Sequence, residues 1–182
     1  MALRSADGSA VTTLSADELH ELEPDLGDQF VRGRIIRENG HCSNPYALAQ
    51  GLARMIEKRG GTILRERVTH FESSGRDVTA VITERGRHPA SHVVLAAGAW
   101  SKEMAKQLGD RVPLDTERGY HIMIRDAESG PRIPTMWAEG KTIATAMDGG
   151  LRFAGTVEFA GLDAAPNWER ATMQMRLGQK MC

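Results

Sequence analysis

The chain has 182 residues, 41% of them hydrophobic and 26% charged, a composition typical of a globular protein with a substantial core. Its 23 basic and 24 acidic residues give a formal net charge of −1, so the overall charge favours neither nucleic acid nor an anionic membrane as a partner. No apolar run approaches the ~20 residues of a transmembrane segment, and we expect a cytoplasmic protein or one peripheral to the inner face of a membrane. The two cysteines, Cys42 and Cys182, predict free thiols and no metal site.

The first part of the chain predicts a short helix, a strand and a longer helix. Residues 15–23 begin with Ser-Ala-Asp-Glu, a capping box that starts a helix. Residues 31–39 are rich in β-branched side chains and predict a strand. Asn44 and Pro45 then supply the N-cap and first position of the longer helix, which Gly60 ends.

The sequence of the middle of the chain predicts three strands followed by a helix. The strands are expected at residues 62–72, 77–84 and 93–101. The last of them reads VVLAAGAWS, and Ser101 is expected to cap a helix that ends at Gly109.

From Val112 onward the pattern changes to β segments. They are expected at residues 112–125, 134–147 and 151–161, with a hairpin turn at Asp148-Gly149-Gly150. The sequence therefore predicts a mixed α/β (α+β) fold in which two subdomains are threaded through each other.

Two groups of residues are candidates for binding. Gly98 lacks a Cβ, so it admits either a ligand close to the backbone or a tight strand-to-helix turn without a ligand, and Trp100 is equally consistent with packing. Arg118, Tyr120 and His121 place a cation, a phenol and an imidazole on one strand, where alternation puts Arg118 with Tyr120 and His121 on the other face. These three are candidate substrate residues, although a half-exposed strand with polar residues outside explains them equally well.

Four stretches of the chain resemble one enzyme family in order and spacing. That family comprises the FAD-dependent amino-acid oxidoreductases, including D-amino acid dehydrogenase, glycine oxidase and sarcosine oxidase, and the D-amino acid dehydrogenase branch is the most similar. The stretches are LSADELHELEPDL, NGHCSNPYALAQGLARMIEKRGGTI, HVVLAAGAWSKEMAKQLGDRVPLDTERGYHI and GGLRFAGTVEFAGLDAAPNWERA.

The chain also departs from that family. The family begins with a strand–GxGxxG–helix unit for the FAD pyrophosphate, and no GxGxxG occurs in these 182 residues. The family ends with a Gly-rich Arg-Pro segment, whereas residues 173–182 do not resemble it. We therefore expect an internal fragment that is inactive as an isolated chain.

The resemblance implies FAD as the cofactor and assigns residues to it. Ala97 and Gly98 would admit the adenosine-diphosphate half of FAD, with Trp100 beside it and the strand that contains Val68 offering backbone groups to the adenine. Residues 44–111 would belong to the FAD-binding domain. Residues 1–43 and 112–182 would form a substrate-binding domain with a single, mostly antiparallel sheet.

The implied reaction is oxidative deamination of a D-amino acid, a small-molecule substrate. The carbon that bears the amine loses a hydride, and water hydrolyses the imine that results. No side chain of this chain is assigned as a catalytic base, and the electron acceptor is not identified. Two alternatives stay open, namely an amine oxidase of the glycine or sarcosine type and a non-catalytic remnant without the FAD phosphate loop.

Overall fold

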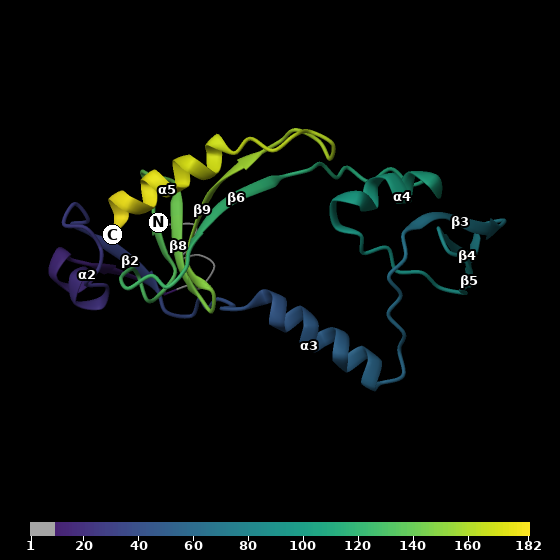
Figure 1. The fold of residues 1–182 in the computed structure, drawn as a ribbon, viewed down its shortest axis with the longest axis horizontal. Helices are drawn as coiled ribbons and strands as arrows, with labels where there is room; N and C mark the ends of the chain where they lie inside the picture. The colour runs from purple at the N-terminus through teal and green to yellow at the C-terminus, as the bar shows by residue number, and fades with distance from the viewer. Residues whose placement is uncertain (1–9) are drawn as a thin grey trace. The chain divides into compact units, whose positions relative to one another are not determined.

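The computed structural model describes residues 10–182, which form two compact units of helices and antiparallel sheets (Figure 1). Of the described residues, the first unit contains residues 10–50, 118–158 and 165–182. The second unit contains residues 51–117 and 159–164. Each unit combines segments that are distant in sequence, and the predicted mixed α/β fold is confirmed.

The first unit begins with a small sheet and a capped helix. β1 (Val11–Leu14) pairs with β2 (Gly33–Ile36), and α2 (Ala16–Leu22) lies between them in sequence. The backbone N–H of Glu18 donates to the Ser15 hydroxyl, and the backbone N–H of Ser15 donates to the Glu18 carboxylate. The predicted capping box is therefore present, and it satisfies two donors that a helix start would otherwise leave unpaired.

A four-stranded antiparallel sheet forms most of the first unit. Its order is β6 (Arg118–Ile124), β9 (Gly150–Glu158), β8 (Thr142–Met147) and β7 (Thr135–Trp137). Met147 pairs with Gly150, which confirms the predicted hairpin turn.

Helix α5 (Glu169–Met181) lies along one face of this sheet (Figure 1). The Thr142 hydroxyl donates to the Gln174 side-chain oxygen at 2.6 Å, and both residues are fully buried. Gly178 packs so closely on Phe153 that a Cβ would lie 3.0 Å from the ring. Small and polar contacts thus hold the helix on the sheet.

The single substrate-domain sheet expected from the sequence is wrong in its topology. β1 and β2 hydrogen-bond only to each other, and the four later strands form a separate sheet. The two sheets nevertheless share one hydrophobic core, in which Leu14 and Leu19 pack with Leu151 and Phe153. Side-chain burial rather than a continuous hydrogen-bonded ladder joins these parts of the chain.

The second unit contains a three-stranded sheet and two helical segments. The strands lie in the order β3 (Val68–Ser74), β4 (Asp77–Thr83) and β5 (Arg87–Pro89). A 3₁₀ turn, η1 (Gly98–Trp100), leads into α4 (Ser101–Gln107).

Helix α3 (Pro45–Lys58) runs across the boundary between the two units in the sequence. The backbone N–H of Ala47 donates to the Asn44 side chain at 2.9 Å, as the predicted cap requires. No helix in residues 10–182 is long and apolar enough to cross a membrane.

In the second unit, the strand expected at 62–72 is present but begins only at Val68, and the strand expected at 93–101 is wrong. Residues 62–67 and 92–97 carry no strand, and the strand expected at 93–101 is an extended segment followed by η1. Ser101 is the first residue of α4 and makes no side-chain cap, because the helical turn already begins at Gly98. An apolar β-branched run becomes a strand only where another strand pairs with its backbone, and the described chain provides none here.

Candidate functional site

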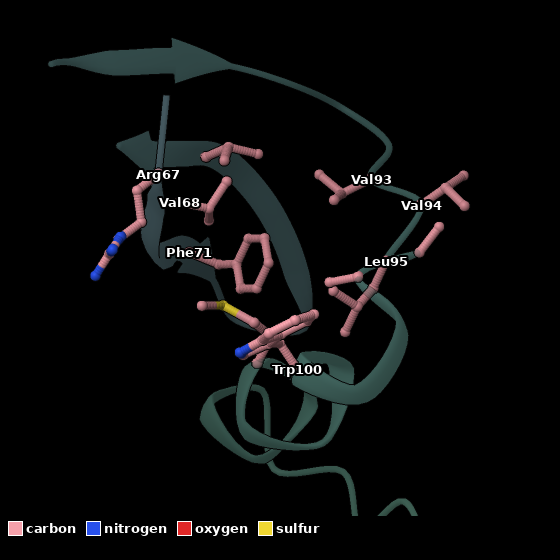
Figure 2. A pocket seen from close by; sticks show the side chains of 11 residues that line it. Arg67, Val68, Phe71, Val93, Val94, Leu95 and Trp100 are labelled. Atoms are coloured by element: carbon pink, nitrogen blue, oxygen red, sulfur yellow. The ribbon is translucent and has the colours of Figure 1, made fainter. Parts of the chain in front are cut away.

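An apolar hollow of about 980 Å³ lies between the three-stranded sheet and the segment that leads into η1 (Figure 2). Val68, Phe71 and Val81 line it from β3 and β4. The opposite wall consists of residues 93–97, and Trp100 and Met104 close one end. Figure 2 shows Phe71, Val93 and Leu95 directed toward the hollow, while the Arg67 guanidinium points away from it.

The residues expected to hold the cofactor come together at this hollow. Val68, Ala97 and Trp100 belong to its lining, and Gly98 follows Ala97 directly. Gly98 has φ +54°, and an added Cβ would meet no atom within 4 Å. The space beside its backbone is therefore open, and glycine adopts this left-handed backbone conformation more readily than residues with a side chain.

The wall of residues 93–97 presents backbone groups and apolar side chains to solvent. Within residues 10–182, no backbone hydrogen bond involves residues 93–96, and Val94 is 90% exposed. The Trp100 side chain is 63% exposed, although indole rings normally bury most of their area. Open amides next to apolar and aromatic surface suit a flat heterocycle with a sugar.

A hydrogen-bonded cluster fixes the chain just before Val68. The Thr83 hydroxyl donates to the Glu66 carboxylate at 2.6 Å, and the ring Nε2 of His88 lies 2.8 Å from the same oxygen. Hydrogen bonds from Thr83 and His88 lower the pKa of Glu66 below its ordinary value. The charged carboxylate thus ties residues 66–68 to β4 and β5 and positions one wall of the hollow.

Arg118 and Tyr120 lie together on β6, as the strand alternation predicts. The Tyr120 hydroxyl donates to Glu158 Oε2 at 2.5 Å, and Arg118 lies 3.4 Å from the same oxygen. The same hydroxyl accepts a hydrogen bond from the backbone N–H of Asn167 at 2.8 Å. Tyr120 is only 5% exposed, so its phenol secures the approach to α5, and its role toward a substrate stays a prediction.

His121 lies on the other face of the sheet, near Arg152, which was not among the predicted site residues. Burial and the nearby Arg152 guanidinium lower the pKa of the His121 imidazole. Arg152 on β9 pairs across the ladder with Met123 on β6 and with Thr145 on β8. In the sequence, the alternation of Arg152 with the apolar residues Leu151 and Phe153 was the available signal that Arg152 lies on the other face of the strand.

No group of three metal-ligating side chains occurs in the part of the chain that the structure describes. Cys42 and Cys182 are free and exposed. Among the residues that line the hollow, Arg67 alone carries an ionisable side chain, and its guanidinium points away from the hollow.

Comparison with known proteins gives concordant matches. The family model described as "FAD dependent oxidoreductase" matches residues 1–182, so the expectation that residues 173–182 fall outside the family pattern is wrong. A D-amino-acid oxidase of Bradyrhizobium diazoefficiens is 43% identical over 169 residues, covering 93% of this chain and 40% of that protein. A D-amino acid dehydrogenase of Vibrio vulnificus is 29% identical over 181 residues, covering 96% of this chain and 43% of that protein.

The fold also matches a solved structure. The crystal structure of glycine oxidase from Bacillus cereus superposes with a TM-score of 0.82 at 20% identity, over 100% of this chain and 50% of that one. The chain thus spans about 40% of the length of the curated relatives cited here and half of this structure.

Proposed function

We propose, because this chain belongs to the family of FAD-dependent oxidoreductases, that it forms part of an enzyme that oxidatively deaminates D-amino acids. In this proposal residues 44–111 contribute to the FAD-binding domain, and residues 1–43 and 112–182 contribute to the substrate-binding domain. The observation that carries it is the convergence of Val68, Ala97 and Trp100 on one hollow beside Gly98.

The residues around the hollow fit the adenosine half of FAD. The open side of Gly98 leaves room for a ribose or phosphate close to the backbone, and the exposed face of Trp100 offers a stacking surface. The unpaired backbone groups of residues 93–96 supply donors and acceptors along the same wall. Val68, at the start of β3, faces this wall and would border the adenine.

When bound, FAD supplies the two-electron acceptor that amino-acid oxidation needs. The substrate-side contribution of this chain is to bind and orient the amino acid. His121, whose pKa is lowered, stays neutral at pH 7 and can exchange hydrogen bonds without adding charge. Arg118 and Tyr120 would act by holding Glu158 and the approach to α5 in place.

The D-amino acid substrate class rests on the names of the relatives, and the electron acceptor is oxygen or a separate carrier. Oxidation of glycine or sarcosine is the second candidate, favoured by the structural match to glycine oxidase. The third candidate is a remnant that does not hold the cofactor. We place the protein in the cytoplasm because both cysteines are free and exposed.

A chimera tests the proposal directly. In the chimera, the matching residues of this chain would replace the 169-residue stretch of the Bradyrhizobium D-amino-acid oxidase. The purified chimera would be assayed for bound flavin and for oxidation of D-alanine, glycine and sarcosine. We expect a yellow protein that oxidises D-alanine fastest. Oxygen consumption compared with reduction of an artificial acceptor then distinguishes an oxidase from a dehydrogenase.

Circular dichroism and gel filtration would establish that the chimera is folded. A folded, flavin-loaded chimera that prefers glycine or sarcosine would replace the proposed substrate by the second candidate. A folded chimera without flavin would contradict the cofactor assignment and support the remnant.

A further inference from the structure

Asn39 is the only one of the chain's three asparagines that is followed by a glycine. Both Asn39 and Gly40 are exposed, in the connection between β2 and α3. The backbone N–H of Asn39 donates to the Ile36 carbonyl at 3.3 Å. Within residues 10–182, neither the Asn39 carboxamide nor the Gly40 backbone N–H takes part in a hydrogen bond, so no protein group holds these two amides in place.

The surroundings of Gly40 are open. A Cβ added at Gly40 would meet no atom within 4 Å. Because glycine has no Cβ of its own and rotates freely about its backbone bonds, its backbone nitrogen can approach the side-chain carbon of the preceding asparagine. A bond between these two atoms closes a small cyclic imide.

Asn44 is excluded from the same reaction. It is followed by Pro45, whose ring nitrogen carries no hydrogen and cannot become the attacking group. The backbone N–H of Ala47 donates to the Asn44 side-chain oxygen at 2.9 Å, and the Asn44 side-chain nitrogen donates to the Asp148 carboxylate at 3.0 Å. Both ends of this carboxamide are therefore engaged.

Asn167 is hindered in two ways. Its side-chain oxygen accepts a hydrogen bond from the backbone N–H of Glu169 at 3.1 Å, which fixes the carboxamide. Trp168 follows it, and the side chain of that residue crowds the nitrogen that would attack. Folding therefore protects Asn167 and leaves Asn39 accessible.

Asp148 and Gly149 form the carboxyl counterpart of the Asn39-Gly40 pair, and they are held differently. Hydrogen bonds from Asn44 and Ser43 lower the pKa of Asp148, so its side chain is an ionised carboxylate at neutral pH. A negatively charged carboxylate repels the attacking nitrogen and has no neutral leaving group. Of the two pairs, only Asn39-Gly40 has a free and reactive side chain.

We propose that Asn39 is a site of spontaneous deamidation and isoaspartate formation. The Gly40 backbone nitrogen gives up its proton to water or hydroxide and bonds to the Asn39 side-chain carbon. The bond from that carbon to its amide nitrogen breaks, and this nitrogen takes up a proton from water and leaves as ammonia. Water then opens the cyclic imide at either carbonyl, which yields an aspartate or an isoaspartate. This proposal does not depend on the proposed function.

The products alter the connection between β2 and α3. Conversion replaces a neutral carboxamide by a carboxylate, so the formal net charge changes from −1 to −2. An isoaspartyl linkage also routes the main chain through the side chain and lengthens it by a methylene group. The change lies close to His41, whose Nε2 lies 3.2 Å from the Ala146 carbonyl oxygen. The charge and the length of this connection would thus change with the age of the protein.

Peptide mass spectrometry of the 182-residue chain, incubated at mildly alkaline pH, tests the proposal. Cleavage after Arg37 and Arg54 releases one peptide that contains both Asn39 and Asn44, and fragmentation distinguishes the two. We expect a mass gain of about 1 Da at Asn39, the difference between an amide and an acid, and none at Asn44. Conversion at Asn167 should be slower by about tenfold or more, the effect of its hydrogen bond and its bulky neighbour.

Gly40→Ala tests the role of the glycine. The open surroundings of Gly40 accept a Cβ, and the added Cβ hinders the attacking nitrogen, so we expect conversion at Asn39 to slow by about tenfold. Gly149→Ala is the matched control, because its surroundings are equally open and it lies in another connection. It should leave the rate at Asn39 unchanged, and circular dichroism would establish that both variants are folded.

The same chain unfolded in urea supplies the reference rate. We expect Asn39 to convert at similar rates in the folded and unfolded chains, because folding leaves its carboxamide exposed and unbonded. Asn167 should convert more slowly in the folded chain. An Asn39 that stays intact in the folded chain, or that converts at an unchanged rate in Gly40→Ala, would overturn the proposal.

Discussion

At the scale of single residues, His121 reports on the charge of Arg152. The positive guanidinium disfavours the protonated imidazolium and, together with burial, lowers the pKa of His121. Arg152→Met should therefore raise that pKa toward its ordinary value, without restoring it fully because burial persists. An NMR titration of the imidazole in the two proteins measures the change, and an unaltered or lower pKa in the variant would contradict the proximity of the two groups.

In the first unit, the buried carboxylate of Glu23 holds the loop that precedes β7. Glu23 is 2% exposed, and its two oxygens accept hydrogen bonds from the backbone N–H groups of Arg132 and Ile133, both at 2.8 Å. Glu23→Gln places an amide donor against one of these N–H groups, and we expect it to lower the free energy of unfolding by about 2–3 kcal/mol. Urea denaturation measures the loss.

The matched control for Glu23 lies two residues earlier, on α2, which Glu23 follows directly. Glu21 is exposed, and Glu21→Gln should change stability by less than about 0.5 kcal/mol. Equal effects of the two substitutions would show that the backbone contacts of Glu23 contribute nothing.

At the scale of elements, features that depend on neighbouring residues could be predicted from the sequence. Strands could not be predicted reliably, because a strand needs a partner strand. The capping box at Ser15, the Asn44 cap and the hairpin before Gly150 depend on neighbouring residues, and all three are present. The strand expected at 93–101 failed because a strand depends on a partner elsewhere in the chain.

The candidate site shows the same division. Gly98 and Trp100 could be selected from the sequence because their residue types are unusual at the end of an apolar run. The proximity of Arg152 to His121 could not be predicted, because it depends on the register of β6 and β9, including the irregularity between Tyr120 and His121. The convergence of Val68 with Ala97 likewise depends on tertiary structure.

The Tyr120 phenol links β6 to the residues that precede α5. Tyr120→Phe removes the donor to Glu158 and the acceptor for the Asn167 N–H, so it should destabilise the chain by about 1–2 kcal/mol. Hydrogen exchange at Asn167 and in the first turn of α5 should accelerate. The chain's other tyrosine, Tyr46, is 72% exposed, and Tyr46→Phe should change neither quantity.

Protection of Asn167 that is identical in Tyr120→Phe and in the parent chain would show that other contacts hold the start of α5.

At the scale of the whole molecule, much apolar surface is accessible. The accessible area is 13638 Å², whereas two separate compact units of these sizes would expose roughly 10,400 Å². On α3, for example, the apolar side chains of Leu48 and Leu52 are 57% and 49% exposed.

We expect the 182-residue chain to bind a hydrophobic dye strongly and to unfold with low cooperativity. Fluorescence with such a dye and calorimetry test this expectation. A sharp two-state transition without dye binding would show that the exposed apolar positions do not loosen the fold.

The central claim is that the hollow beside Gly98 receives the adenosine half of FAD, and NMR titration of the chain with adenosine diphosphate tests it most directly. The account predicts shifts at Val68, Gly98 and the Trp100 indole N–H, all lost in Gly98→Val because the new side chain fills the open space. Gly75→Val is the matched control, since Gly75 has φ +64° and equally open surroundings but lies outside the hollow, and it should keep the shifts. Shifts that survive in Gly98→Val, or that disappear equally in both variants, would contradict the claim.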